Sequence, residues 1–162
     1  LEDNIGYIAL YEFTEQTEPQ YMEAFEALKD QGMERLIIDV RNNPGGLLTS
    51  VCDILEDILP EGLIVYTEDK NGEREEYTCD GENELDIPLA VLVNGNSASA
   101  SEIFAGAIQD YSKGTIVGTT TFGKGIVRVS FLLMMAALLK LQQRNIIHPV
   151  ENVSMEQESS RM

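Results

Sequence analysis

Short apolar runs alternate with amphipathic segments from residue 5 to residue 125. Segments 63–67 and 74–79 flank Asn71-Gly72, a pair that favours a β-hairpin. The apolar runs at 36–40 and 88–93 are continuous, which is typical of strands buried in a parallel sheet. In all, strands are predicted at residues 5–13, 36–40, 63–67, 74–79, 88–93 and 115–118.

Apolar residues at helical spacing separate these strands. Thr17 and Gln20 have the spacing of a capping box at the start of the first helix, and Pro60 ends the second. Because strands alternate with helices, we expect an α/β layered fold. The three helical faces are Tyr21, Met22, Phe25 and Leu28; Leu48, Val51, Leu55 and Ile58; and Ile103, Phe104, Ala107, Ile108 and Tyr111.

The composition narrows the classes of partner. The chain has 162 residues, which suits one domain, and a net charge of −17, which repels nucleic acid and anionic membranes. Cys52 and Cys79 lack the spacing of metal ligands, so we expect no metal site; a disulfide between them stays open. The first residue is Leu1, so we expect a fragment whose amino-terminal part lies outside this chain.

A serine-rich segment, residues 94–102, links a predicted strand to a predicted helix. A nucleophilic serine needs backbone N–H groups and small neighbours close to its hydroxyl, and the first turn of a helix offers unpaired N–H groups. Ser99 is the candidate nucleophile. Because Ser99 and Glu102 also match the capping pattern S-x-x-E, a purely structural helix cap is the alternative.

Two glycine-rich turns could complete such a site. Asn43-Pro44-Gly45-Gly46 follows a buried strand, and its glycines would let backbone N–H groups approach a substrate, although for this segment alone a tight turn into a helix is the favoured explanation. Lys124 lies between Gly123 and Gly125 and could act as a general base if desolvation lowered its pKa.

Other catalytic arrangements fit this sequence less well. Gly118, Gly123 and Lys124 match part of a phosphate-binding loop, but Gly125 stands where that loop needs Ser or Thr, so an NTPase is disfavoured. Histidine is disfavoured as the base, because the only one, His148, lies in the segment 128–162, whose anomalous sequence is described below. Asp110 is eleven residues beyond Ser99, about 16 Å along a helix, so it could support the helix end or the Lys124 turn but could not orient the base.

Three motifs together resemble the C-terminal processing (tail-specific) serine peptidases: RNNPGGLL at 41–48, SASASEIFAGAIQDY at 97–111 and GTTTFGKG at 118–125. The resemblance implies Ser99 as nucleophile, Lys124 as base, and the N–H groups of Gly45 and Ala100 as the oxyanion hole. It also implies a spiral α/β core like those of the ClpP and crotonase folds, and protein or peptide substrates cleaved near their carboxyl termini without a metal or other cofactor. It further implies a location outside the cytoplasm and, in most members, a PDZ domain ahead of this region.

The resemblance weakens after the lysine turn. The family has Gln four residues after the base, where this chain has Arg128, which lacks an acceptor for the lysine's hydrogen bond. Residues 126–162 hold only 3 of the 28 acidic residues. The segment from Phe131 can also be back-translated into codons that, when read in a neighbouring frame, encode a sequence resembling the family's usual continuation. We therefore divide the chain into a catalytic core, 1–127, and an anomalous tail, 128–162, for which a frameshift is the leading hypothesis and an amphipathic tail helix the alternative.

Three functions follow from these residues. The first is a Ser–Lys endopeptidase that acts on proteins with accessible carboxyl termini. The second is an inactive peptidase-like module that binds protein tails. The third, an acyl-CoA enzyme of crotonase type, fits the fold but gives no purpose to a Ser–Lys pair.

Overall fold

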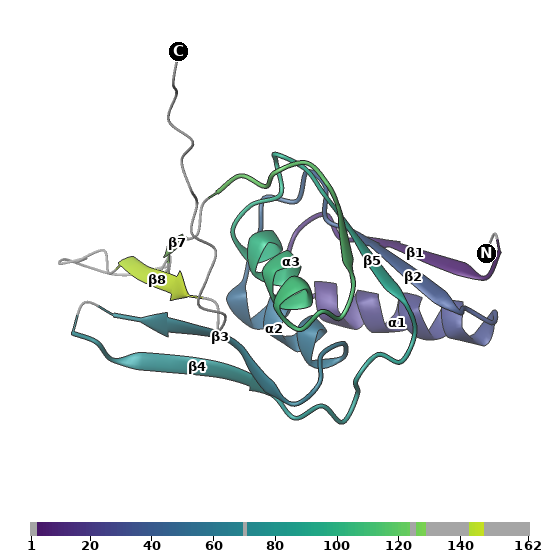
Figure 1. Ribbon diagram of the computed structural model, residues 1–162, viewed down its shortest axis with the longest axis horizontal. Coiled ribbons are helices and arrows are strands. Elements are labelled where there is room, and N and C mark those ends of the chain that lie inside the picture. Colours follow the sequence, from purple (N-terminus) through teal and green to yellow (C-terminus); the bar gives the residue numbers. More distant parts are fainter. Residues whose placement is uncertain (1–2, 70, 124–125, 129–142, 148–162) are drawn as a thin grey trace, which may run out of the picture.

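The computed structural model describes residues 3–69, 71–123, 126–128 and 143–147, which form two sheets and three helices (Figure 1). The parallel sheet has the strand order β1-β2-β5-β6, formed by Ile5–Ala9, Arg35–Asp39, Leu89–Val93 and Thr115–Gly118. The antiparallel sheet has the order β4-β3-β8-β7, formed by Arg74–Cys79, Gly62–Glu68, Gln143–Ile147 and Ile126–Arg128. The helices are α1 (Thr17–Asp30), α2 (Leu48–Glu56) and α3 (Ala100–Asp110). The α/β prediction is thus confirmed.

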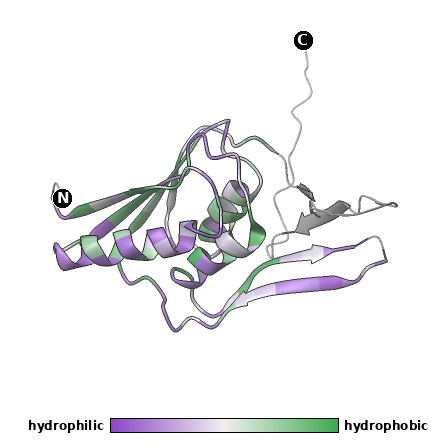
Figure 2. Cartoon of the chain, turned by 180° about the vertical axis from the view of Figure 1, so that it is seen from behind, coloured by the Kyte–Doolittle hydropathy of each residue, from purple (hydrophilic) through white to green (hydrophobic). Residues whose placement is uncertain are grey.

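The core lies between the helices and one face of the parallel sheet. Alternate side chains of each strand point to this face, and in β2 Leu36 and Ile38 are at most 1% exposed. Helix α1 packs against β1, α3 packs against β6, and α2 contacts both other helices. The side chains on the opposite face of the sheet are less buried: Tyr7 is 52% exposed and Val117 47%. Figure 2 shows β1, β2 and β5 mainly in the hydrophobic colour.

Helix α2 buries its apolar side chains in the core. Val51, Ile54 and Leu55 have no measurable exposure, and Cys52 is 6% exposed. Thr49 and Asp53 of the same helix are exposed, so α2 is amphipathic, as expected for a helix that covers one face of a sheet.

Two expectations about element boundaries were wrong. The first strand ends at Ala9 rather than at residue 13, and Phe13 instead forms an isolated parallel bridge with Gly46. The predicted capping box of α1 is absent, because the Thr17 hydroxyl donates to Glu12 O (3.0 Å) and accepts the Thr14 N–H (2.9 Å). Gln16 takes the N-cap position without a side-chain bond.

The β3–β4 hairpin was predicted correctly. The hairpin extends beyond the helices, and β4 carries mainly hydrophilic residues (Figures 1 and 2). Cys52 and Cys79 are both buried free thiols, so the disulfide is not formed. The proposed tail helix lies outside the described residues.

Candidate active site

Ser99 lies at the junction predicted for a nucleophile, between β5 and α3. It occupies the N-cap position of α3 with φ 55° and ψ −116°, a backbone conformation that L residues rarely adopt. Such a conformation costs about 1–3 kcal/mol and persists only where the surrounding structure enforces it. The first helical N–H group, that of Ala100, has no acceptor within the described part of the chain and is available to a ligand.

Glu102 connects Ser99 to the turn that leads to Lys124. Its Oε2 accepts the Ser99 N–H (3.0 Å), so the capping interaction proposed as the structural alternative is present. Its Oε1 accepts the Thr121 hydroxyl (3.0 Å) and the Gly123 N–H (2.6 Å). One carboxylate therefore caps the helix and also fixes the neighbouring turn. The sequence indicated the cap but not the second pair of bonds.

The glycine turn after β2 lies against Ser99. A Cβ built on Gly45 would be 2.7 Å from Ser99 Cβ and 2.9 Å from Ala100 N, so only glycine allows this approach. The predicted oxyanion donors, Gly45 and Ala100, are thus brought together. The Gly45 N–H, however, donates to Asn43 Oδ1 (2.8 Å). A substrate oxygen must therefore replace that internal acceptor.

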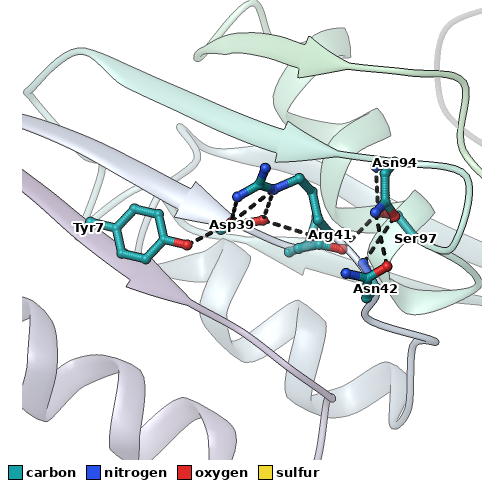
Figure 3. A network of polar contacts seen from close by, with 7 residues as sticks. Tyr7, Asp39, Arg41, Asn42, Asn94 and Ser97 are labelled. Carbon is teal, nitrogen blue, oxygen red and sulfur yellow. Dashed lines mark hydrogen bonds and ion pairs between the residues drawn. The ribbon is translucent and has the colours of Figure 1, made fainter.

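An asparagine cluster joins the loops that follow β2 and β5. Asn42 Oδ1 accepts from Asn94 Nδ2 (3.0 Å) and Asn96 Nδ2 (2.9 Å), and Asn94 Oδ1 accepts the Asn42 N–H (3.0 Å). Figure 3 shows Asn42, Asn94 and Ser97 meeting at this edge. The carboxyl ends of adjacent parallel strands are the usual place for ligands in α/β folds.

A charged network extends from this edge along the less buried face of the sheet (Figure 3). Asp39, which is 7% exposed, accepts from Arg41 Nη2 (2.6 Å) and from the Tyr7 hydroxyl (2.6 Å). The hydrogen bonds from Arg41 lower the pKa of Asp39 to about 2, despite its burial. The Asp39 carboxylate is therefore ionised and fully engaged, which suits a structural role at the end of β2.

The remaining predicted residues are placed only in part. Lys124 and Gly125 lie outside the described residues, so the Ser99–Lys124 pairing stays a prediction. Gly123 precedes Lys124 in a left-handed conformation, with φ 79°. Asp110 is the last residue of α3, at the opposite end of the helix from Ser99, so it does not approach the nucleophile.

The sequence profile of peptidase family S41 matches residues 4–158. The chain belongs to this family. The resemblance inferred from the three motifs is therefore confirmed, and family membership disfavours the acyl-CoA reading.

Named S41 relatives are similar over most of this chain. A carboxyl-terminal-processing protease of Synechocystis sp. is 47% identical over 130 residues, covering 80% of this chain and 30% of that protein. The carboxy-terminal processing protease CtpA of Bacillus subtilis is 36% identical over 130 residues, covering 80% of this chain and 28% of that protein. The chain thus spans less than a third of the length of either relative.

A solved S41 structure has the same fold. The photosystem II D1 C-terminal processing protease aligns with a TM-score of 0.71 and 39% identity, covering 77% of this chain and 33% of that chain. The α/β core with its parallel sheet is therefore the S41 fold.

Backbone donors and the Glu102 carboxylate surround Ser99 in this candidate site. Across the described ranges, no group of three or more His, Cys, Asp or Glu side chains is arranged to hold a metal ion. A search of the same ranges for a helix long and apolar enough to cross a membrane found none.

Sequence reasoning overlooked three buried residues of this site: Asn43, Ser97 and Ser101, each with no measurable exposure. Their polar side chains bond to backbone atoms of segments far away in the sequence. The alternating S-A-S-A-S pattern was the available signal, since hydroxyls at positions that flank a nucleophile in a buried loop need partners.

Proposed function

We propose that this S41 domain is a serine endopeptidase that cleaves protein substrates near their carboxyl termini by a Ser–Lys mechanism. The observation that carries the proposal is the position of Ser99: a strained helix N-cap with the Gly45 backbone against it and the Ala100 N–H unpaired. Strained residues of this kind cluster at active sites.

In the proposed reaction, neutral Lys124 accepts the proton of the Ser99 hydroxyl as Oγ attacks the substrate carbonyl carbon. The carbonyl oxygen becomes an oxyanion and takes hydrogen bonds from Ala100 N–H and Gly45 N–H, the second displacing Asn43 Oδ1. Lys124 then returns the proton to the departing amine, and water hydrolyses the acyl-enzyme. Each backbone donor contributes about 10²–10³ in rate.

Glu102 supports this assignment of the base. Its carboxylate accepts hydrogen bonds from the Ser99 N–H, the Thr121 hydroxyl and the Gly123 N–H. Gly123 directly precedes Lys124, so one side chain holds both the backbone of the nucleophile and the turn that carries the proposed base. Relatives named C-terminal processing proteases make protein tails the proposed substrates. Two relatives are named chloroplastic, and a location outside the cytoplasm stays a prediction for this chain.

A serine-directed fluorophosphonate tests the nucleophile. We expect wild type to be labelled at Ser99, Ser99→Ala to lose the label, and Ser112→Ala to keep it. Ser112 is the matched control because it also has a positive φ (52°) but lies beyond the other end of α3. Equal labelling of the Ser99→Ala variant would contradict the proposal.

The second candidate is an inactive S41 module that binds protein tails. It is favoured by one feature, Arg128 at the position where the family has Gln. If wild type does not react with the fluorophosphonate or cleave peptides, and both wild type and Ser99→Ala bind a carboxyl-terminal peptide, this candidate is supported.

A further inference from the structure

Two serines flank the nucleophile at equal spacing, Ser97 and Ser101, and neither has any measurable exposure. The Ser97 hydroxyl donates to Val40 O (2.7 Å) and accepts the Asn94 N–H (3.0 Å). The Ser101 hydroxyl donates to Asn43 O (3.0 Å). Both donated bonds cross from the nucleophile loop to the segment that follows β2.

Asn43 connects both bonds to the glycine turn, because it accepts from Ser101 and its own N–H donates to Val40 O (3.3 Å), the acceptor of Ser97. Its carbonyl oxygen also accepts the Ala98 N–H (3.1 Å), so two donors on either side of Ser99 hold one backbone atom. Its side chain donates through Nδ2 to Leu10 O (2.9 Å) and accepts the Gly45 N–H through Oδ1 (2.8 Å). The position of Asn43 therefore sets the position of Gly45.

We propose that Ser97 and Ser101 are positioning residues, whose hydroxyls hold the glycine turn at the distance from Ser99 that a functional oxyanion hole requires. This inference rests on the proposed peptidase function. It assigns distinct roles within the serine-rich motif: the central hydroxyl is the nucleophile, and the two outer hydroxyls fix the distance between two loops.

The geometry leaves little tolerance at this contact. The space beside Gly45 is so narrow that a single added carbon would lie 2.7 Å from both Ala98 O and Ser99 Cβ. Small displacements of such donors are costly, because a misplacement of about 1 Å lowers the rate about 100-fold. Loss of the Ser101 hydroxyl leaves Asn43 O with one donor rather than two and releases the turn on the side nearest Ala100.

Burial alone does not explain these hydroxyls. Ser50, in α2, is 3% exposed, and its hydroxyl has no hydrogen-bond partner within the described part of the chain. This fold therefore accommodates a buried serine that bonds to nothing. Ser50→Ala removes a buried hydroxyl without removing a contact between the two loops, which makes it the matched control.

The test measures the second-order rate constant for phosphonylation of Ser99 and the exchange of the Ala98 and Gly45 amide hydrogens by NMR. For Ser97→Ala and Ser101→Ala we expect phosphonylation to slow about 10- to 100-fold and both amides to exchange faster. Ser50→Ala is expected to match wild type in both measurements. Ser101→Thr, which keeps the hydroxyl, is expected to restore most of the rate.

The two readouts separate this inference from the proposed function. If both alanine variants react within twofold of wild type and the amide exchange is unchanged, the positioning role is overturned. If wild type does not react with the probe, the proposed function fails, and the amide exchange rates alone then test the positioning role. Faster exchange of Ala98 and Gly45 in Ser101→Ala, but not in Ser50→Ala, supports the positioning role, and unchanged exchange overturns it.

Discussion

Polar side chains have different partners in two regions of this domain. The carboxyl ends of β2 and β5 form the edge that the proposed function makes catalytic, called the catalytic edge below. Here Ser97 and Ser101 are buried and bond to backbone atoms more than fifty residues away, Ser97 to Val40 and Ser101 to Asn43. On the acidic side, formed by the end of α2, the β3–β4 hairpin and residues 80–86, most polar side chains are carboxylates that face solvent or one another.

This difference shows in which region hydrogen bonds fix the positions of the atoms closely. Buried hydrogen bonds hold positions closely, because an unpaired buried group costs about 1–3 kcal/mol. Exposed charges interact through water and salt, so a typical surface pair contributes between about 0 and 1 kcal/mol. Substitutions at the catalytic edge should therefore change reactivity, and substitutions on the acidic side should change stability slightly and depend on pH or salt.

The largest effect is expected for Gly45→Ala. The new methyl group would lie 2.7 Å from Ser99 Cβ, and alanine is strained at φ 106°. We expect phosphonylation of Ser99 to fall by at least about 100-fold. Gly72→Ala, in the hairpin turn, is the control, because Gly72 also has a positive φ (82°) but no atom within 4 Å of the added methyl. Equal losses in both variants would show that backbone strain alone is responsible.

Glu102→Gln should have the next largest effect. A glutamine side chain has one acceptor oxygen, so it cannot accept both the Ser99 N–H on one side and the Thr121 and Gly123 donors on the other. We expect phosphonylation to slow about tenfold, since bonds to a charged acceptor are worth about 1.5–3 kcal/mol each. Glu76→Gln, exposed on β4, should react as wild type does. A normal rate in Glu102→Gln would remove this carboxylate from the positioning of the site.

Asp57→Asn should stabilise the domain at alkaline pH. Burial, together with Glu18 and Glu56, raises the pKa of Asp57 from 3.8 to about 6, and a bond from Asn83 only partly opposes this. Because the folded state holds this proton more tightly than the unfolded state, wild-type stability falls as pH rises through about 4 to 6.

Urea unfolding at pH 4 and pH 8 checks this prediction. At pH 8 the variant should gain about 1 kcal/mol after allowance for solvent screening of this half-buried group. At pH 4 the gain should be absent, because Asp57 is then mostly protonated in the folded domain. Equal stabilisation at both pH values would mean that the charge of Asp57 is not the cause.

The smallest effect is expected for Arg74→Ala on the hairpin. Arg74 pairs with Glu68 (2.7 Å) and its guanidinium lies 4.5 Å from the centre of the Tyr66 ring, but its side chain is 53% exposed. We expect the melting temperature to change by no more than about 2 °C, and the difference to shrink in about 1 M salt. A larger shift that persists in salt would place the hairpin among the rigid parts of the fold.

The sequence predicted the elements well and the contacts between loops poorly. Periodicity located all three helices and the strands from β1 to β6, because alternate burial of apolar residues is written into local sequence. The end of β1 and the first turn of α1 were misjudged, since Thr17 bonds to Glu12 and Phe13 pairs with Gly46, and neither choice has a local signal.

For the candidate site, too, the residue types were predictable from the sequence and the contacts between them were not. The chemical type of Ser99 and Gly45 and their small neighbours was visible in the sequence. The engagement of the Gly45 N–H by Asn43 and the bridging role of Glu102 were not. The first depends on the exact conformation of the glycine turn, and the second on how the turn after β6 approaches the start of α3. The bonds of Ser97 to Val40 and of Ser101 to Asn43 span more than fifty residues, so only the folded sheet defines them.

The alkylation rates of the two buried cysteines report how often their surroundings open. A cysteine reacts with an alkylating agent as the thiolate, and burial raises the pKa of Cys52 to about 12 and also raises that of Cys79. Either thiol is therefore alkylated at neutral pH only when its surroundings open. Cys52 lies in α2, within the helical layer, and Cys79 is the last residue of β4, so the ratio of their alkylation rates in the native protein compares how often the helical layer and the end of the hairpin open.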